Sequence, residues 1–236
     1  VLVTGASKGI GKAIAKTLAE SGAKVMMSSR KEDALREAAK EINGVTEVFA
    51  ANAGDIASGR ECIAATIEKF GGVDILINNA GIFEANPVAR PDDAWLESWN
   101  RTMQVNLTAS ADLCRRAVLH WQENGASGRI VNIASRAAHR GDSPAHWHYA
   151  ASKAGMVAMT KTIARAYAKE GIYAFAICPG FTMTGMAEDY LESRGGDKLL
   201  ADIPLGKVAD PEEVAIMAKF CALDAPPSMT GAILDV

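Results

Sequence analysis

The chain has 236 residues, of which 49% are hydrophobic and 22% are charged, a composition that fits a globular protein and excludes a disordered one. Its formal net charge of −3 provides no basic field, so we expect neither nucleic acid nor a membrane as a partner. No apolar run reaches the roughly 20 residues that span a bilayer. Four widely spaced cysteines lack a metal-binding pattern and are typical of a reducing compartment, so we expect a cytoplasmic protein without a metal.

Short apolar runs rich in β-branched residues alternate with longer helical patterns along the whole chain. The predicted strands are residues 1–3, 24–28, 47–50, 73–77, 129–133, 173–178 and 232–236. The predicted helices are residues 10–21, 31–42, 57–70, 92–122, 149–169 and 211–223. Most of the strands are apolar at nearly every position, as strands buried on both faces are.

This alternation predicts parallel strands joined by right-handed crossovers. We therefore predict a single α/β domain over residues 1–236, with a Rossmann-type, doubly wound parallel sheet of about seven strands and helices on both faces. Ligands bind beyond the carboxyl ends of the strands in such sheets, so the residues that follow each strand are the candidates for a site.

A glycine-rich segment joins the first predicted strand to the first helix. Its glycines permit a tight turn and close approach of the backbone to a pyrophosphate, which the helix amino terminus would attract. The Gly-x-x-x-Gly-x-Gly spacing differs from the commoner Gly-x-Gly-x-x-Gly pattern, and a purely structural tight turn is the alternative. The candidate phosphate-turn residues are Gly5, Ser7, Lys8, Gly9, Ile10 and Gly11.

The end of the second predicted strand indicates which cofactor binds. NAD-binding folds usually place an acidic residue there to accept hydrogen bonds from the adenosine ribose. Ser29 occupies that place, Arg30 follows it, and Lys8 lies in the glycine loop. A 2′-phosphate requires cationic donors, so the sequence favours NADP(H). NAD(H) remains possible if Arg30 is only a solvated side chain.

Tyr149 and Lys153 stand four residues apart in a strongly helical segment, so their side chains share one helix face. A free phenol has a pKa of about 10, and a lysine cation beside it favours phenolate and lowers that pKa. The pair is common in proteins and indicates nothing alone. Here Ser135 follows the strand at residues 129–133 and reaches the same sheet edge, where its hydroxyl can bind a substrate oxygen. We therefore predict acid/base catalysis by Tyr149.

Two asparagines lie near these residues. Asn79 follows the strand at residues 73–77, and by itself it would be a cap on the strand end. Asn106 lies within the helical pattern of residues 92–122, although asparagine is a mediocre helix former. By itself it would be a kink or a satisfied core amide.

Together these motifs resemble the short-chain dehydrogenase/reductase family, in its compact branch, over essentially the whole chain. The motifs are Thr-Gly-x-x-x-Gly-x-Gly at residues 4–11, Asn-Asn-Ala-Gly at 78–81, Asn106, Ser135, Tyr149 with Lys153, and Pro179-Gly180. No single motif is specific, but their order is. The resemblance implies hydride transfer between a nicotinamide and a ketone, aldehyde or secondary alcohol.

The resemblance also implies a role for each residue. Tyr149 would be the general acid or base, Ser135 would orient the substrate oxygen, and Lys153 would lower the tyrosine pKa and hold the nicotinamide ribose. Asn106 would hold a water of the proton relay. Asn52 stands where the family usually has an aspartate that meets adenine. The remaining implied cofactor contacts are Ala53, Asn79, Ala80, Gly81, Tyr149, Pro179, Gly180, Thr182 and Thr184.

The substrate end of the predicted site is less defined. The loop at residues 136–148 should wall the pocket, and His139, Arg140 and Trp147 are its candidate substrate contacts. Its three histidines suit no standard closed zinc site. Residues 182–204, with several glycines, suggest a lid over the bound substrate. The interval from Ser135 to Tyr149 is about one residue longer than the family pattern, which enlarges this loop.

Three alternatives to a simple carbonyl reductase stay open. Relatives that reduce acyl groups on a carrier protein use basic residues near Arg129 and at the end of the Tyr149 helix, where this chain has Glu170 instead. A cofactor-sensing regulator would be expected to lose the Tyr149–Lys153 pair, and an assembly scaffold would leave the phosphate loop unexplained.

The apolar faces of helices 92–122 and 149–169 suggest a homodimer or homotetramer.

Overall fold

The computed structural model describes residues 1–183, 200, 201 and 203–236. Its seven strands form one parallel sheet in the order β3-β2-β1-β4-β5-β6-β7. They are β1 Leu2–Thr4, β2 Val25–Ser29, β3 Thr46–Ala50, β4 Ile75–Asn78, β5 Gly128–Ile133, β6 Ile172–Cys178 and β7 Ile233–Asp235. The predicted doubly wound α/β sheet is confirmed, and the strand order reverses between β1 and β4.

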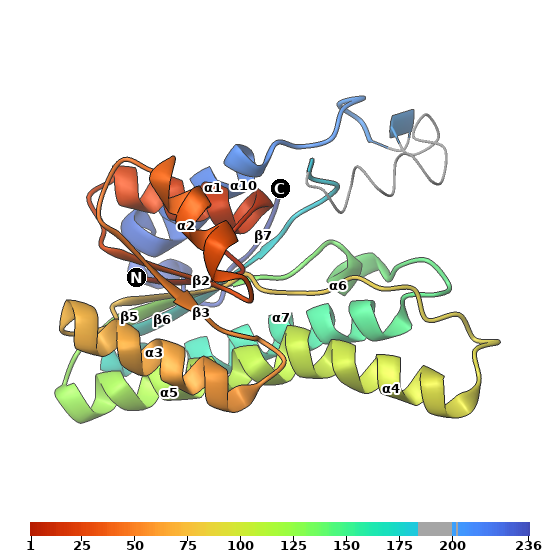
Figure 1. The fold of residues 1–236 in the computed structure, drawn as a ribbon, viewed down its shortest axis with the longest axis horizontal. Helices are drawn as coiled ribbons and strands as arrows, with labels where there is room; N and C mark the ends of the chain where they lie inside the picture. Colours follow the sequence, from red (N-terminus) through yellow and green to blue (C-terminus); the bar gives the residue numbers. More distant parts are fainter. Residues whose placement is uncertain (184–199, 202) are drawn as a thin grey trace.

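Helices cover both faces of the sheet (Figure 1). One face carries α1 Gly9–Glu20, α2 Glu32–Lys40 and α10 Pro211–Lys219, which is followed by the π turn η3 Phe220–Asp224. The other carries α3 Ile56–Phe70, α5 Ala109–Asn124 and α7 Trp147–Tyr167, with α4 Asp92–Met103 extending beyond the sheet edge. Two short 3-10 turns, η2 Ala168–Glu170 and η4 Pro227–Met229, lie nearer the carboxyl terminus.

The continuous apolar strands are explained by two cores, one on each face. In β1, Val3 packs into the core with α1 and α10, while Leu2 packs into the core with α3, α5 and α7. In β4, Ile77 packs into the first of these cores and Leu76 packs into the second. Because side chains alternate between faces along a strand, a strand that is buried on both sides must be apolar at nearly every position.

The predicted helix at residues 92–122 is helical throughout but is not one α-helix. A π turn, η1 Gln104–Thr108, separates α4 from α5. The predicted long loop between Ser135 and Tyr149 also contains a short helix, α6 Ala137–Arg140, and α7 begins two residues before Tyr149. Both differences lie at the cavity described below.

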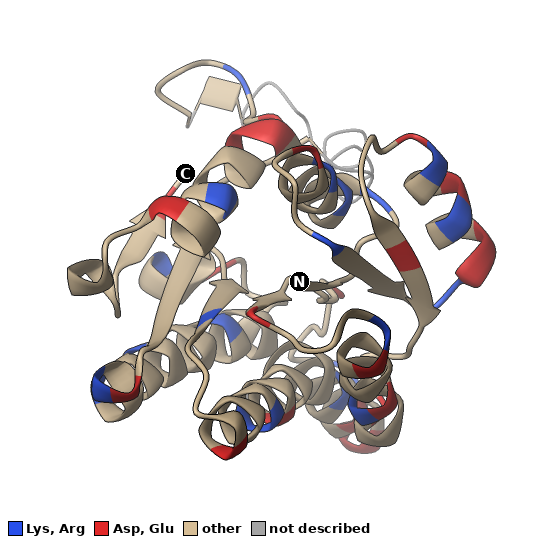
Figure 2. Cartoon of the chain, turned by 90° about the vertical axis from the view of Figure 1, so that its left-hand side faces the viewer, with Lys and Arg blue, Asp and Glu red and all other residues tan. Residues whose placement is uncertain are grey.

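Charged residues lie mainly on the outer helices, where basic and acidic residues alternate (Figure 2). On α2, for example, Arg36 pairs with Glu32 and Lys40 with Glu37. Within the described parts of the chain, no helix is long and apolar enough to cross a membrane.

Candidate active site

A cavity of about 1000 Å³ lies beyond the carboxyl ends of the strands. It brings together nearly all of the residues that the sequence predicted: Gly5, Ser7, Lys8, Gly9, Ile10, Gly11, Arg30, Asn52, Ala53, Asn79, Ala80, Gly81, Ser135, Tyr149, Lys153, Pro179, Gly180 and Thr182. Asn106 is behind the lining, and Thr184 and most of the predicted lid at residues 182–204 lie outside the described residues.

The glycine turn at one end of the cavity requires its glycines. Gly5 has a φ of +67°, in the left-handed region that favours glycine. A Cβ on Gly11 would lie 2.2 Å from the carbonyl oxygen of Gly5 and 2.4 Å from Nδ2 of Asn79. The turn therefore packs directly against the end of β4, with no room for a side chain at Gly11.

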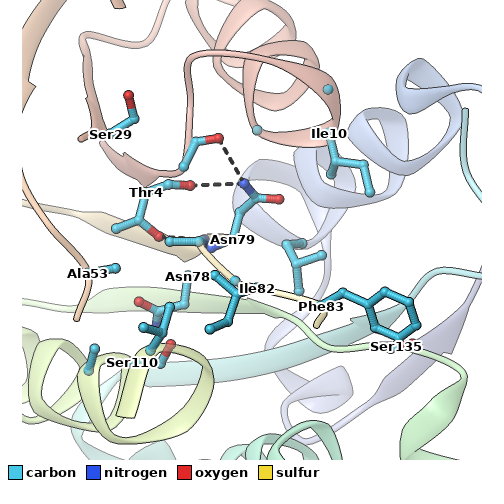
Figure 3. A pocket seen from close by; sticks show the side chains of 18 of the residues that line it. Thr4, Ile10, Ser29, Ala53, Asn78, Asn79, Ile82, Phe83, Ser110 and Ser135 are labelled. Atoms are coloured by element: carbon cyan, nitrogen blue, oxygen red, sulfur yellow. Dashed lines mark hydrogen bonds between the residues drawn. The ribbon is translucent and has the colours of Figure 1, made fainter. Parts of the chain in front are cut away.

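Asn79 holds this turn against β4 (Figure 3). Its Nδ2 donates to the carbonyl oxygens of Thr4, at 3.0 Å, and Gly5, at 3.2 Å. The hydroxyl of Thr4 accepts the backbone N–H groups of Asn79 and Ala80, both at 3.0 Å. Asn79 is thus a structural clamp between the two central strands, as its position after a strand indicated, and it lines the cavity as well.

Cations surround the end of β2. Arg30 and Lys31 line the cavity beside Ser29, whose buried Oγ has no hydrogen-bond partner among the described residues. No carboxylate occupies the place of Ser29, as the sequence analysis noted. At the neighbouring strand, Oδ1 of Asn52 accepts the backbone N–H of Gly54 at 3.0 Å. The atom that was expected to meet adenine therefore already supports its own turn.

Asn106 lies in the π turn η1 and is fully buried. Its Oδ1 accepts the backbone N–H of Ile82 at 2.8 Å, and its Nδ2 donates to the carbonyl oxygen of Ile82 at 3.0 Å and to Oγ of Ser152 at 3.2 Å. The side chain thus anchors the loop after β4 to the helix. The sequence left two interpretations of Asn106 open, a helix kink and a satisfied core amide. These hydrogen bonds fit the satisfied core amide, and the π turn is the irregularity in the helix.

Tyr149, Ser135 and Lys153 converge at the other end of the cavity. The side chains of Ser135 and Tyr149 lie close enough for Ser135 to lower the pKa of the phenol. The Nζ of Lys153 lies 5.8 Å from the centroid of the Tyr149 ring and donates to the carbonyl oxygen of Ile133 at 2.8 Å. Residues of β5 and α7, far apart in sequence, therefore place two hydroxyls and an ammonium group around one point.

Burial controls the proton affinities of these groups. It raises the pKa of Tyr149 to about 12, against the opposing effect of the Ser135 hydrogen bond. It also lowers the pKa of Lys153 to about 8, because a buried ammonium is poorly solvated. The effect of Lys153 on the tyrosine pKa stays a prediction of the family resemblance. Here Tyr149 is a neutral phenol, which is the form that donates a proton.

An aromatic cluster supports Tyr149 from the side. The ring of Phe83 stacks on that of His146, with centroids 4.0 Å apart, and meets the ring of Tyr149 edge-on at 4.8 Å. The Nδ1 of His146 lies 2.6 Å from Oγ of Ser143. His148 stacks on Trp99 in the same cluster, with 6.3 Å between centroids. These two histidines therefore pack behind Tyr149 rather than lining the cavity.

Of the three candidate substrate contacts in the loop, only Arg140 lines the cavity. Trp147 is 55% exposed, and Nε2 of His139 lies 3.3 Å from a carboxylate oxygen of Asp235. His139, Asp235 and Cys178 bring one potential metal-ligand atom each within 4.8 Å of one another. His139 and Asp235 are exposed and contact each other, so this cluster by itself assigns no metal.

Several lining residues were not predicted from the sequence. Phe83, Val105 and Phe181 contribute apolar surface, and Lys31 adds a cation. Each lies within two positions of a predicted site residue in the sequence, and this proximity could have indicated that it lines the cavity. Their inward orientation depends on loop geometry, which no spacing rule encodes.

Comparisons with known proteins agree with this geometry. Residues 5–236 match the family model described as Enoyl-(Acyl carrier protein) reductase. The 3-oxoacyl-(acyl-carrier-protein) reductase of Vibrio cholerae is 37% identical, covering 100% of this chain and 94% of the relative. The 3beta-hydroxysteroid dehydrogenase 1 of Eggerthella lenta is 39% identical, covering 100% and 91%.

Among solved structures, a variant of actinorhodin polyketide ketoreductase with NADPH superimposes with a TM-score of 0.91 at 32% identity, covering 100% of this chain and 94% of that one. Whole-length identity, sheet order and the cavity thus point the same way. The chain belongs to the short-chain dehydrogenase/reductase family and is an NAD(P)-dependent oxidoreductase that acts on small alcohol and carbonyl compounds.

Proposed function

We propose that the protein is an NADP(H)-dependent carbonyl reductase or alcohol dehydrogenase in which Tyr149 is the general acid or base. One observation carries this proposal. Ser135 and Tyr149 both line one end of a cavity whose other end is a glycine turn. Reduction requires a proton donor beside the substrate and a dinucleotide whose pyrophosphate is held at the other end of the cavity.

The residues of the cavity fit the cofactor. The glycine turn lines the cavity, where its backbone could meet a pyrophosphate, and the amino terminus of α1 begins there. The unpartnered Oγ of Ser29 and the cations Lys8, Arg30 and Lys31 support a phosphate on the adenosine ribose. Lys153, Pro179, Gly180 and Thr182 would hold the nicotinamide end.

When bound, the nicotinamide supplies or accepts the hydride. The chain's own part is to hold the substrate oxygen and to move one proton. Ser135 would donate a hydrogen bond to that oxygen and stabilise the negative charge that develops on it. Tyr149 would transfer its phenolic proton to the same oxygen, and Lys153, as a cation beside it, would stabilise the phenolate that remains.

A substrate on a carrier protein is less well supported. The guanidinium of Arg129, near which such relatives use basic residues, donates to the carbonyl oxygen of Cys221 at 2.9 Å and lies over the ring of Tyr173. It therefore joins β5 to η3 and to Tyr173 of β6. Glu170, in the place of the second cation, accepts a hydrogen bond from Gln122. A free substrate is favoured.

We also infer a homodimer or homotetramer formed through α5 and α7. Ala154, Ala158 and Ala166 are exposed on α7, and such small side chains permit close approach of a second helix. Light scattering of the wild type and of Ala158→Arg tests the interface, because the variant should shift the protein toward monomers.

All four cysteines are free and buried, which supports the expected reducing, cytoplasmic compartment.

The function is tested by following NADPH oxidation with panels of ketones, sugars and acyl thioesters. Tyr149→Phe should lower turnover by about a thousandfold while NADPH affinity stays within about twofold of wild type. Wild-type rates in this variant would refute the role of Tyr149.

The cofactor preference is tested separately. Arg30→Ala should weaken NADPH binding about tenfold and leave NADH binding unchanged. Arg36→Ala, which removes an exposed arginine on α2 that pairs with Glu32, is the control and should alter neither affinity. Equal weakening of both cofactors by Arg30→Ala would refute the phosphate contact.

A further inference from the structure

A polar turn at residues 140–143 lines the cavity. It follows α6, which ends at Arg140, and Gly141 takes a φ of +75°, a conformation that favours glycine. The turn thereby carries a guanidinium, on Arg140, and a carboxylate, on Asp142, two positions apart in the cavity wall. Neither residue has a role in the proton transfer proposed above.

The carboxylate of Asp142 has one oxygen available to a ligand. Its Oδ1 accepts the backbone N–H of Ser143 at 2.7 Å and lies 4.0 Å from Nδ1 of His146, so the side chain is held in place. Within the described residues, no hydrogen-bond donor contacts Oδ2. The side chain is 25% exposed and lines the cavity. Its Oδ2 can therefore accept a hydrogen bond from a bound molecule without disturbing the turn.

The same carboxylate lies within electrostatic reach of the Tyr149 phenol. Burial is the main cause of the raised pKa of Tyr149, and the negative charge of Asp142 raises it further. Such an effect decreases with distance, so the two side chains belong to the same end of the cavity. A carbonyl oxygen held by Ser135 and Tyr149 would therefore place the neighbouring carbon atoms of a substrate toward this wall.

The charges of the turn favour a neutral polar group over an ion. Arg140 lines the wall beside Asp142 and forms no ion pair within the described residues. An anion would be repelled by Asp142, and a cation would be repelled by Arg140. A hydroxyl group carries no charge and can donate its proton to a carboxylate, which forms a stronger hydrogen bond than two neutral groups do.

We propose that Oδ2 of Asp142 accepts a hydrogen bond from a hydroxyl group on the carbon next to the substrate carbonyl, so that the enzyme selects neutral hydroxy ketones over plain ketones. The inference rests on the proposed function, because it takes Ser135 and Tyr149 to hold the carbonyl oxygen. A plain ketone would cover the carboxylate without offering it a donor, which is unfavourable. Asp142 thus determines specificity and takes no part in the proton transfer.

Two pairs of ketones of equal size test the preference. Hydroxyacetone is compared with 2-butanone, and dihydroxyacetone with 3-pentanone, by following NADPH oxidation. Each pair differs only by hydroxyl groups in place of methyl groups, and the hydroxylated member should have a kcat/KM at least about tenfold higher. Equal efficiencies within both pairs would overturn the proposal. Because a neighbouring hydroxyl also activates a carbonyl chemically, the decisive quantity is how the ratio within a pair changes in a variant.

A variant of Asp142 then locates the effect. Asp142→Asn removes the charge and one acceptor but keeps an oxygen for the N–H of Ser143. It should lower the ratio of kcat/KM for hydroxyacetone to that for 2-butanone about tenfold, through loss on hydroxyacetone alone. Asp224→Asn, which alters an exposed aspartate of η3 outside the cavity lining, is the matched control and should leave the ratio unchanged. An unchanged ratio in Asp142→Asn, or equal losses on both ketones, would overturn the hydroxyl contact.

A binding measurement distinguishes failure of this proposal from failure of the proposed function. NMR titration of Tyr149→Phe protein, saturated with NADP⁺, reports how tightly each ketone binds without turnover. Hydroxyacetone should bind about tenfold more tightly than 2-butanone, and Asp142→Asn in this background should remove the difference. Selective binding of hydroxyacetone by a protein whose turnover does not depend on Tyr149 would refute the proposed function alone. Equal binding of the two ketones would refute the hydroxyl contact.

Discussion

The two ends of the cavity are built in different ways. The cofactor end is closely packed backbone: the glycine turn touches β4, and the side-chain amide of Asn79 donates to the carbonyl oxygens of Thr4 and Gly5. The substrate end is made of side chains on a short helix and a loop, with buried titratable groups at its centre. Substitutions that add side-chain volume should therefore disrupt the cofactor end, and substitutions that change charge should alter the substrate end.

The largest expected effect is that of Lys153→Met at the substrate end. Turnover should fall by about a thousandfold, yet the cofactor-free variant should be more stable than wild type at pH 7. Burial lowers the pKa of Lys153 from 10.5 to about 8, so the charged side chain destabilises the folded chain. The gain on replacing it should be about 3 kcal/mol, since one pKa unit corresponds to about 1.4 kcal/mol.

The stability difference between Lys153→Met and the wild type should depend on pH. The folded chain releases the lysine proton at a lower pH than the unfolded chain does. The destabilisation is therefore complete below about pH 8 and disappears as the pH rises toward 10.5. Thermal unfolding of both proteins between pH 7 and pH 10 measures the difference. A variant less stable than wild type at pH 7 would contradict the assignment of a strained, buried cation.

The next effect is expected at the cofactor end. Gly11→Ala places a methyl group 2.2 Å from the carbonyl oxygen of Gly5, so the turn must move away from β4. We expect a loss of about 1–3 kcal/mol in the free energy of unfolding, together with NADPH binding weakened at least about tenfold. Urea unfolding and cofactor titration measure the two quantities.

Gly59→Ala in α3 is the matched control for stability. A Cβ there would lie 3.8 Å from Leu113, an ordinary contact, and alanine is the better helix former. The control should be as stable as wild type or more so by up to about 1 kcal/mol. If both substitutions lower stability equally, the turn is not the tight element that the geometry indicates.

The smallest effect should come from the aromatic support of Tyr149. Phe83→Ala removes a ring that contacts Tyr149 at 4.8 Å and His146 at 4.0 Å. Such pairs contribute about 0.5–1.5 kcal/mol, so kcat should fall about two- to tenfold. His146→Phe keeps a stacked ring and should retain kcat. A change in KM alone would show that Phe83 contacts the substrate rather than positioning Tyr149.

The same contrast explains what could be read from the sequence. The strands, the glycine turn and the positions of Ser135 and Tyr149 follow from periodicity and order, because buried strands and tight turns restrict residue type. The π turn at Asn106 was only partly foreseen, since an asparagine signals irregularity without specifying its form. The contacts of Phe83 and Arg136 depend on how loops fold over the sheet edge, and many residue types would be compatible with those positions.

The π turn also bears on how the chain tolerates insertions and deletions. A π turn is an α-helix with one additional residue, so removing one residue from η1 would restore regular helix geometry and rotate α4 by about 100° relative to α5. Asn106 could then no longer hold both backbone groups of Ile82. Shortening the chain by one residue here would improve the helix locally and release the loop between the two ends of the cavity.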